Sequence, residues 1–132
     1  MEALKLAKEY VAALDDIPEW QEKVRANLIH HGCNNIDYFE TKEGIITRYQ
    51  TATIRPDIAL LDINLDIHDE DNREGLDVCR FFKETSPTTT IVVVSSLKDI
   101  LEEAKKSGAD FFIQKKDLRE GFDTFVEQYT NP

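Results

Sequence analysis

The chain has 132 residues, of which 41% are hydrophobic, and its 26 acidic and 16 basic side chains give a net charge of -10. A chain of this length buries roughly two thirds of its unfolded surface, which suffices for one hydrophobic core and excludes a second domain. The negative charge repels phosphate groups and argues against direct binding to nucleic acid or to an anionic membrane, so we expect a protein or a cation as partner.

Short apolar runs alternate with segments of helical period along the whole chain. This alternation predicts a parallel sheet with right-handed crossover helices, because strands buried on both faces are continuously hydrophobic. We expect strands at residues 9–14, 35–39, 57–61, 91–94 and 111–114. We expect helices at residues 18–31, 41–51, 75–84, 97–107 and from 117 onward.

Several residues mark where these helices begin and end. Pro18 suits a first helical turn, and Gly32 and Gly108 suit left-handed helix stops. Two pairs have the spacing of a capping box, namely Ser96 with Asp99 and Asp117 with Glu120.

The first strand is the least determined element. The apolar residues between Leu4 and Leu14 also fit a helical period, so residues 1–14 could instead form one helix. We favour the strand, because residues 15–18 then become the strand-to-helix turn that the architecture requires.

A carboxylate follows the third apolar run directly, since residues 57–61 lead into Asp62. Aspartate is depleted in strands and costly to bury without a partner, so this position points to a site. Ligands bind outside the carboxyl ends of parallel strands, and polar side chains at the ends of several strands meet at one edge. The other strand-end groups are Asp15, Asp16, Ser95, Ser96 and Lys115.

These strand-end groups suit the binding of a cation and a phosphoryl group. Carboxylates that converge without a nearby arginine repel one another unless a hard cation neutralises them, and Mg²⁺ prefers such oxygen ligands. Asp15, Asp16 and Asp62 therefore predict a magnesium site. The Lys115 ammonium and the Ser95 hydroxyl could bind the oxygens of a phosphoryl group attached to Asp62.

Each of these residues alone fits a helix cap or a solvated charge, but the ordered set, from about residue 9 to residue 129, resembles the receiver domains of two-component response regulators. The resemblance implies a flavodoxin-like α/β fold, a doubly wound five-stranded parallel sheet of order 2-1-3-4-5 with five helices. It also implies one receiver domain over residues 1–132, similar to the single chemotaxis-type receivers.

The same resemblance assigns roles to individual residues. Asp62 would accept a phosphoryl group from a phosphohistidine on a sensor histidine kinase or a phosphotransfer protein. Asp15 and Asp16 would bind Mg²⁺ together with Asp62 and the backbone carbonyl of Asn64. Such a domain assists its own phosphorylation and dephosphorylation and is not otherwise an enzyme.

The resemblance further implies a conformational switch. Ser95 is similar to the switch hydroxyl of the family, Lys115 to the lysine that pairs with the phosphoryl group, and Phe112 to the switch aromatic. A phosphorylation-linked dimer is one consequence that such a switch could have. The downstream target of the chain is left open.

Two segments depart from the family pattern. Residues 65–74 form a longer loop without proline, which we interpret as mainly a solvated charge run; His68 within it fits no calcium or zinc motif. Lys116 stands where the family often has proline, and residues 95–115 make a somewhat shorter segment than usual, so partner choice is harder to predict than chemistry.

Two other functions compete with a phosphorylated receiver. The first is a pseudo-receiver that acts as a protein-binding scaffold without phosphorylation. The second is a Mg²⁺-dependent aspartyl phosphatase, which usually needs a second aspartate where this chain has Asn64, and an asparagine cannot act as a general acid. The two cysteines predict reduced, buried thiols, which together with the absence of a signal-peptide pattern suits a cytoplasmic protein with no membrane span.

Overall fold

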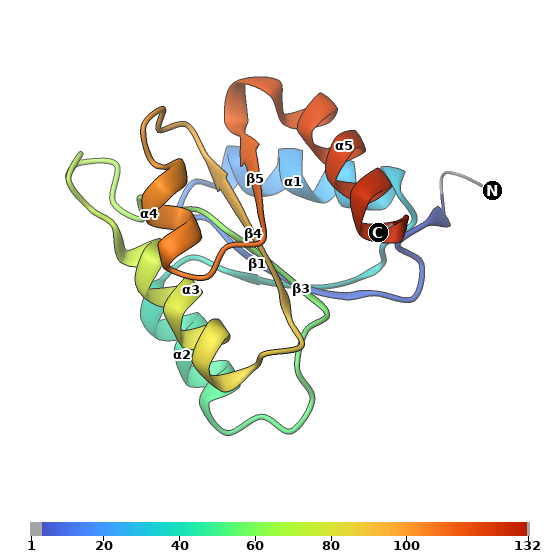
Figure 1. Ribbon diagram of the computed structural model, residues 1–132, viewed down its shortest axis with the longest axis horizontal. Coiled ribbons are helices and arrows are strands. Elements are labelled where there is room, and N and C mark those ends of the chain that lie inside the picture. The colour runs from blue at the N-terminus through green and yellow to red at the C-terminus, as the bar shows by residue number, and fades with distance from the viewer. Residues whose placement is uncertain (1–3, 132) are drawn as a thin grey trace.

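The computed structural model describes residues 4–131, and a five-stranded parallel sheet of order β2-β1-β3-β4-β5 forms its centre (Figure 1). The strands are β1 (Tyr10–Leu14), β2 (Asn35–Phe39), β3 (Ile58–Leu61), β4 (Thr90–Ser95) and β5 (Phe111–Gln114). The helices are α1 (Pro18–His30), α2 (Lys42–Gln50), α3 (Glu74–Thr85), α4 (Leu101–Lys106) and α5 (Leu118–Thr130), and the 3-10 turn η2 (Lys115–Asp117) leads into α5. The predicted fold class is confirmed.

Helices cover both faces of the sheet, with α1 and α5 on one face and α2, α3 and α4 on the other (Figure 1). Successive strand residues point to opposite faces, so the core divides into two clusters. Leu61 and Val93 belong to the cluster that contains Phe82 of α3, whereas Leu60 belongs to the cluster that contains Phe122 of α5. This double burial explains why the central strands read as continuous apolar runs.

The strand interpretation of the first element is confirmed, because β1 begins at Tyr10 and pairs with β2 and β3. Pairing on both sides outweighs the weak strand preference of Ala12 and Ala13. The helical alternative for residues 1–14 is wrong from residue 10 onward, and residues 1–3 of that alternative lie outside the described residues.

Helix α4 begins at Leu101, so the predicted start at residue 97 is wrong. The hydroxyl of Ser95 accepts a hydrogen bond from the Leu97 amide at 3.0 Å, which turns the backbone away from a helix immediately after β4. Within residues 4–131, neither predicted capping box forms: α4 has Ile100 at its N-cap, and Asp117 precedes α5 without a side-chain cap bond.

The helix stops and the cysteines agree with the sequence-based expectations. Gly32 and Gly108 have φ values of 88° and 108°, a backbone conformation that residues with a side chain rarely adopt. Cys33 and Cys79 are free, buried thiols. In the part of the chain that the structure describes, no helix combines the length and the apolar character that crossing a membrane requires.

Candidate functional site

Strand register brings the acidic residues together at the carboxyl edge of the sheet. Leu14 pairs with Leu61, so Asp15 and Asp62, which follow them, leave the sheet side by side. One carboxylate oxygen from each of Asp15, Asp16 and Asp62 lies within 4.8 Å of the others. The three carboxylates that the sequence selected therefore form one cluster.

Lys115 reaches this cluster from the end of β5. Its ammonium lies 2.9 Å from Oδ2 of Asp15 and 3.3 Å from Oδ2 of Asp62, and its side chain is only 4% exposed. A buried ammonium is costly unless it is paired, and here two carboxylates pair with it. The single positive charge still leaves the three acidic groups in excess.

Burial, and to a smaller extent the neighbouring charges, shift the pKa values of two of the acidic groups. Burial raises the pKa of Asp62 to about 7; Lys115 opposes this shift, and Asp15 adds to it. Burial, together with the charge of Asp15, also raises the pKa of Asp16. Both carboxyls would release their protons more readily beside an added cation.

The donor set fits a hard divalent cation. Oδ1 of Asp16 is buried and receives no hydrogen bond from any described residue, so it is available as a ligand. Oδ1 of Asp15 accepts a hydrogen bond from the Ile17 amide at 2.9 Å, which fixes that carboxylate in the turn before α1. Oxygen donors of this kind are what Mg²⁺ prefers.

A cavity of about 200 Å³ opens beside Asp62. The strand-end residues and the first turn of α1 contribute part of its lining, and the loop after β3 contributes the rest. The lining residues are Asp16, Ile17, Trp20, Asp62, Asn64, Ile67, Glu70, Ser96, Leu97 and Lys115.

The structure separates the two serines at the end of β4. Ser95 is 1% exposed and does not line the cavity; its hydroxyl is held by the Leu97 amide. Ser96 lines the cavity and is exposed. Phe112 lies on β5, packs against the cluster on the α3 and α4 face, and does not line this cavity either.

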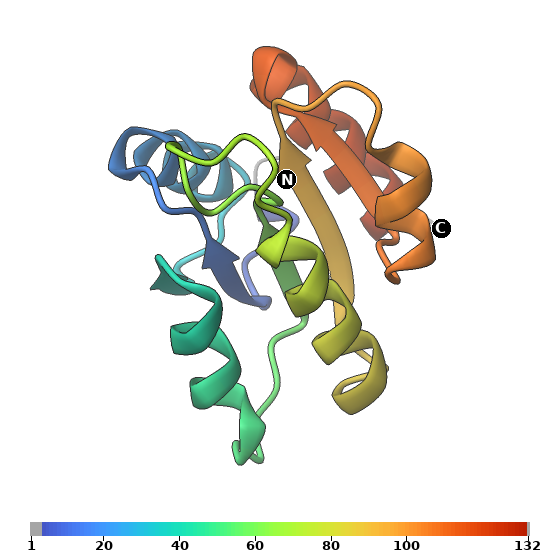
Figure 2. The same ribbon diagram turned by 90° about the vertical axis from the view of Figure 1, so that its left-hand side faces the viewer.

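The loop of residues 65–74 lies at the edge toward which the strand arrows point, where Figure 2 shows it in yellow-green. Most of the loop is exposed, as expected for a mainly solvated charge run, and two of its exposed residues, Ile67 and Glu70, also line the cavity. Asn64 starts the loop: its side chain accepts from the Asp66 amide at 2.8 Å and donates to the Asp69 carbonyl at 2.9 Å.

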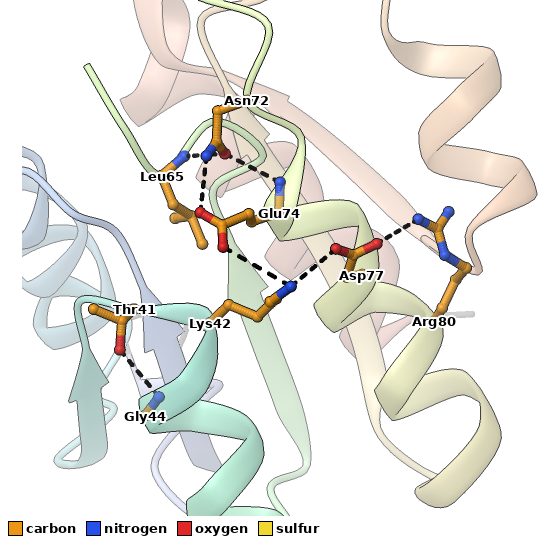
Figure 3. A network of polar contacts seen from close by, with 8 residues as sticks. All are labelled: Thr41, Lys42, Gly44, Leu65, Asn72, Glu74, Asp77 and Arg80. Atoms are coloured by element: carbon orange, nitrogen blue, oxygen red, sulfur yellow. Dashed lines mark hydrogen bonds and ion pairs between the residues drawn. The ribbon is translucent and has the colours of Figure 1, made fainter. Parts of the chain in front are cut away.

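A polar network fastens the far end of this loop to α2 and α3 (Figure 3). Oδ1 of Asn72 accepts hydrogen bonds from the amides of Leu65 and Glu74, at 3.0 and 3.1 Å. Lys42 of α2 lies 3.8 Å from Glu74 and 3.3 Å from Asp77, so it links the loop to both helices. Ile67 and Glu70, which line the cavity, therefore belong to a loop that is anchored to both helices.

Gly75 allows α3 to approach the site closely. A Cβ at this position would overlap the backbone of Asp62 and Ile63, and the Gly75 amide donates to the Ile63 carbonyl at 2.9 Å. The first turn of α3 therefore packs directly on the chain segment that carries Asp62.

Trp20 of α1 was not among the site residues that the sequence predicted, although it lines the cavity. The ammonium of Lys115 lies 4.9 Å from the centroid of the Trp20 ring, and that of Lys23 lies 4.4 Å from it. Such contacts stabilise a cation over the ring face. The available signal was position, because Trp20 lies in the first turn of the helix that follows Asp15 and Asp16.

Residues 11–124 match the family model described as the response regulator receiver domain, so the chain belongs to this family of two-component signalling proteins. Members of the family are generally phosphoacceptors that bind Mg²⁺ in an acidic pocket and interact with histidine kinases or phosphotransfer proteins. None of the curated proteins compared with the chain matches it.

Solved structures show the same fold. The chain is 24% identical to the BeF3-activated DrrB receiver domain, with a TM-score of 0.74 over 94% of this chain and 98% of that one. For the response regulator DrrB of Thermotoga maritima, an OmpR/PhoB homolog, the identity is 24% and the TM-score 0.73, over 92% of this chain and 52% of that one. A CheY-like receiver domain from Methylobacillus flagellatus is 20% identical, with a TM-score of 0.72 over 91% and 97% of the two chains.

We expect Asp62→Asn to stabilise the metal-free protein, and by more at pH 8 than at pH 5. The pKa of Asp62 is about 7 in the folded chain, which is above its value in the unfolded chain. As the pH rises, this carboxyl therefore ionises in the unfolded chain first. Between the pKa of Asp62 in the unfolded chain and pH 7, its ionisation therefore lowers the free energy of unfolding increasingly. Above pH 7 this loss levels off at about 4 kcal/mol. The asparagine removes this cost.

Urea unfolding in EDTA at the two pH values measures the effect. Asp69→Asn, in the exposed part of the loop, is the matched control and should show no such pH dependence. An Asp62→Asn advantage of equal size at pH 5 and pH 8 would contradict the raised pKa.

Proposed function

We propose that this chain is a phosphorylation-controlled signalling module in which Asp62 accepts a phosphoryl group from a histidine kinase or a phosphotransfer protein. The observation that carries the proposal is the position of Asp62 at the cavity, beside two further carboxylates and 3.3 Å from the Lys115 ammonium. A phosphoryl group bound there has a cationic partner already in place.

Asp15, Asp16, Asp62 and the backbone carbonyl of Asn64 would hold Mg²⁺, which supplies the positive charge that neutralises the transferred phosphoryl group. An ionised oxygen of Asp62 attacks the phosphorus, an O–P bond forms, and the N–P bond to the donor imidazole breaks. The released imidazole nitrogen takes up a proton. Lys115 then binds phosphoryl oxygens in place of part of its present pairing with Asp62.

The switch involves Ser95 and Phe112. The Ser95 hydroxyl is held in its resting place by the Leu97 amide, and α4 begins only at Leu101, so residues 97–100 form a non-helical segment between the two. A cavity of about 50 Å³ beside Phe112, lined also by α4, leaves room for the ring to move. These features support a coupled rearrangement of α4 and β5.

An aspartyl phosphatase activity is less well supported than phosphoacceptance. The side chain of Asn64 bonds within the loop and has no acidic proton to give to a leaving group. We therefore propose Asp62 phosphorylation itself, rather than turnover of another substrate, as the chemistry of this site.

We expect a small phosphodonor with Mg²⁺ to add one phosphoryl group to the chain, seen by intact mass spectrometry, and beryllofluoride to bind at the same position. Asp62→Asn should lose both, and Asp69→Asn should retain both, because Asp62, unlike Asp69, lies at the cavity beside Lys115. An unchanged adduct in Asp62→Asn would sink the assignment. A parent protein that takes up no phosphoryl group would favour the scaffold function.

We expect Asp16→Ala to weaken Mg²⁺ binding by about tenfold or more, because it removes a buried oxygen that receives no hydrogen bond from the described residues. Asp69→Ala should leave the affinity unchanged, since that carboxylate accepts from the Asp71 amide at 3.0 Å within the exposed loop. Titration calorimetry compares the two variants. If Asp69→Ala were the more damaging, the loop would belong to the metal site.

We expect Ser95→Ala to uncouple modification from the surface change. Asp62 should still bind beryllofluoride, while the amide chemical shifts from Leu97 to Phe112 respond less than in the parent, because the hydroxyl that moves toward the phosphoryl group is gone. Ser96→Ala is the matched control and should respond fully. Full-sized shifts in Ser95→Ala, with reduced shifts in Ser96→Ala, would transfer the role to Ser96.

A further inference from the structure

A second group of metal-ligating side chains lies away from the acidic cluster, between α1 and α5. It consists of His30 and His31, at the end of α1, and Asp123 of α5. Helix α1 has 13 residues, so this group is separated from the turn that carries Asp15 by about 20 Å along the helix. None of its members takes part in the proposed phosphoryl chemistry.

The geometry of the three side chains is close to that of a metal site. One ligand atom from each of the three lies within 4.8 Å of the others. Nε2 of His31 is 2.9 Å from Oδ1 of Asp123, and the His30 ring stands edge-on to the His31 ring at 5.0 Å between centroids. Tetrahedral Zn²⁺ with bonds of about 2.0 Å separates its ligands by about 3.3 Å, so the contact between His31 and Asp123 needs to open only slightly.

Two of the three ligands, His30 and Asp123, are free to rotate toward a bound ion. His30 and Asp123 are exposed, whereas His31 is buried and its backbone carbonyl accepts from the Leu6 amide at 2.9 Å. One ligand is therefore fixed, and rotation of the two exposed side chains can bring their atoms to bonding distance. The N-terminal segment at Leu6 is attached to the fixed ligand.

The electrostatic surroundings favour a cation. The carboxyl end of α1 carries the negative end of the helix dipole, and Asp123 adds a full negative charge. The neighbouring basic group on α5, Arg119, donates to Oδ1 of Asn27 at 3.4 Å. Lys5 pairs with Glu127 at 2.9 Å, one turn beyond Asp123.

We propose that His30, His31 and Asp123 form a second metal site, which takes a divalent transition ion of the Zn²⁺ type through two imidazole nitrogens and one carboxylate oxygen, with water completing the coordination. Imidazole selects such ions over Mg²⁺, so the chain would carry two sites that differ in ligand hardness. The bound ion joins α1 to α5 and stiffens the attachment of the N-terminal segment.

Zinc titration of the full chain in saturating Mg²⁺, followed by calorimetry, tests this site while the acidic cluster is occupied. We expect one zinc ion per chain, and His30→Ala and Asp123→Asn should each weaken binding by about tenfold or more. His30 and Asp123 are exposed, so neither variant should impair folding, which circular dichroism checks. The chain has three histidines, and His68→Ala is the matched control that should bind zinc normally.

Imidazole nitrogen signals in NMR supply a second readout, because zinc should shift those of His30 and His31 and leave those of His68 in place. Zinc binding that survives both His30→Ala and Asp123→Asn, or that disappears in His68→Ala or Asp16→Ala, would overturn the proposal by locating the ion in the loop or in the acidic cluster. No detectable binding in the parent would also overturn it. None of these outcomes bears on phosphorylation of Asp62, which is measured separately.

Discussion

The pairing of the Lys115 ammonium with Asp15 and Asp62 is the interaction on which the carboxyl edge of the sheet depends. β5 and β3 are separated in the sheet by β4, so the lysine bridges strands that do not hydrogen-bond to each other. The bridge requires the ends of β1, β3 and β5 to lie in register, because these strands carry Asp15, Asp62 and Lys115 at their ends. The packing of both faces of the sheet maintains this register. The bridge also removes three charged side chains from water. Its net contribution to the stability of the fold is therefore small compared with the stability that is lost when one partner is removed.

The acidic excess around Lys115 connects stability with reactivity. One ammonium compensates three carboxylates only in part, and burial leaves Asp62 with a pKa of about 7, so the metal-free site opposes its own ionisation. A divalent cation bound there would remove this penalty and favour the ionised form of Asp62, which is the form that the proposed transfer requires. The same electrostatic repulsion that destabilises the metal-free fold would therefore make the proposed phosphoryl transfer depend on the metal.

The fold and the positions of the acidic residues followed from the sequence because they depend on patterns that local chemistry determines. A strand buried on both faces must be apolar throughout, so a carboxylate such as Asp62 marks its end. The start of α4 was predicted wrongly because Ser96 and Asp99 have the spacing of a capping box, whereas in the fold the Leu97 amide donates to the Ser95 hydroxyl and α4 begins at Leu101. Sequence reasoning missed three cavity residues, Trp20, Ile67 and Glu70. Their contact with the cavity depends on how a helix and a loop pack in three dimensions, and the hydrophobic period of the sequence does not reveal such packing.

The loop of residues 65–74 changes the electrostatics of the cavity in a way that strand-end residues alone do not reveal. Its far end is fixed by Asn72 and Lys42, so Ile67 and Glu70 are presented at the cavity by an anchored segment. Glu70 adds a carboxylate to a wall that already contains Asp16 and Asp62, and among the described residues Lys115 is the one cation that lines it. In the proposed function an anionic phosphodonor would pass these carboxylates, so a bound cation would aid its access to Asp62 as well as the transfer step.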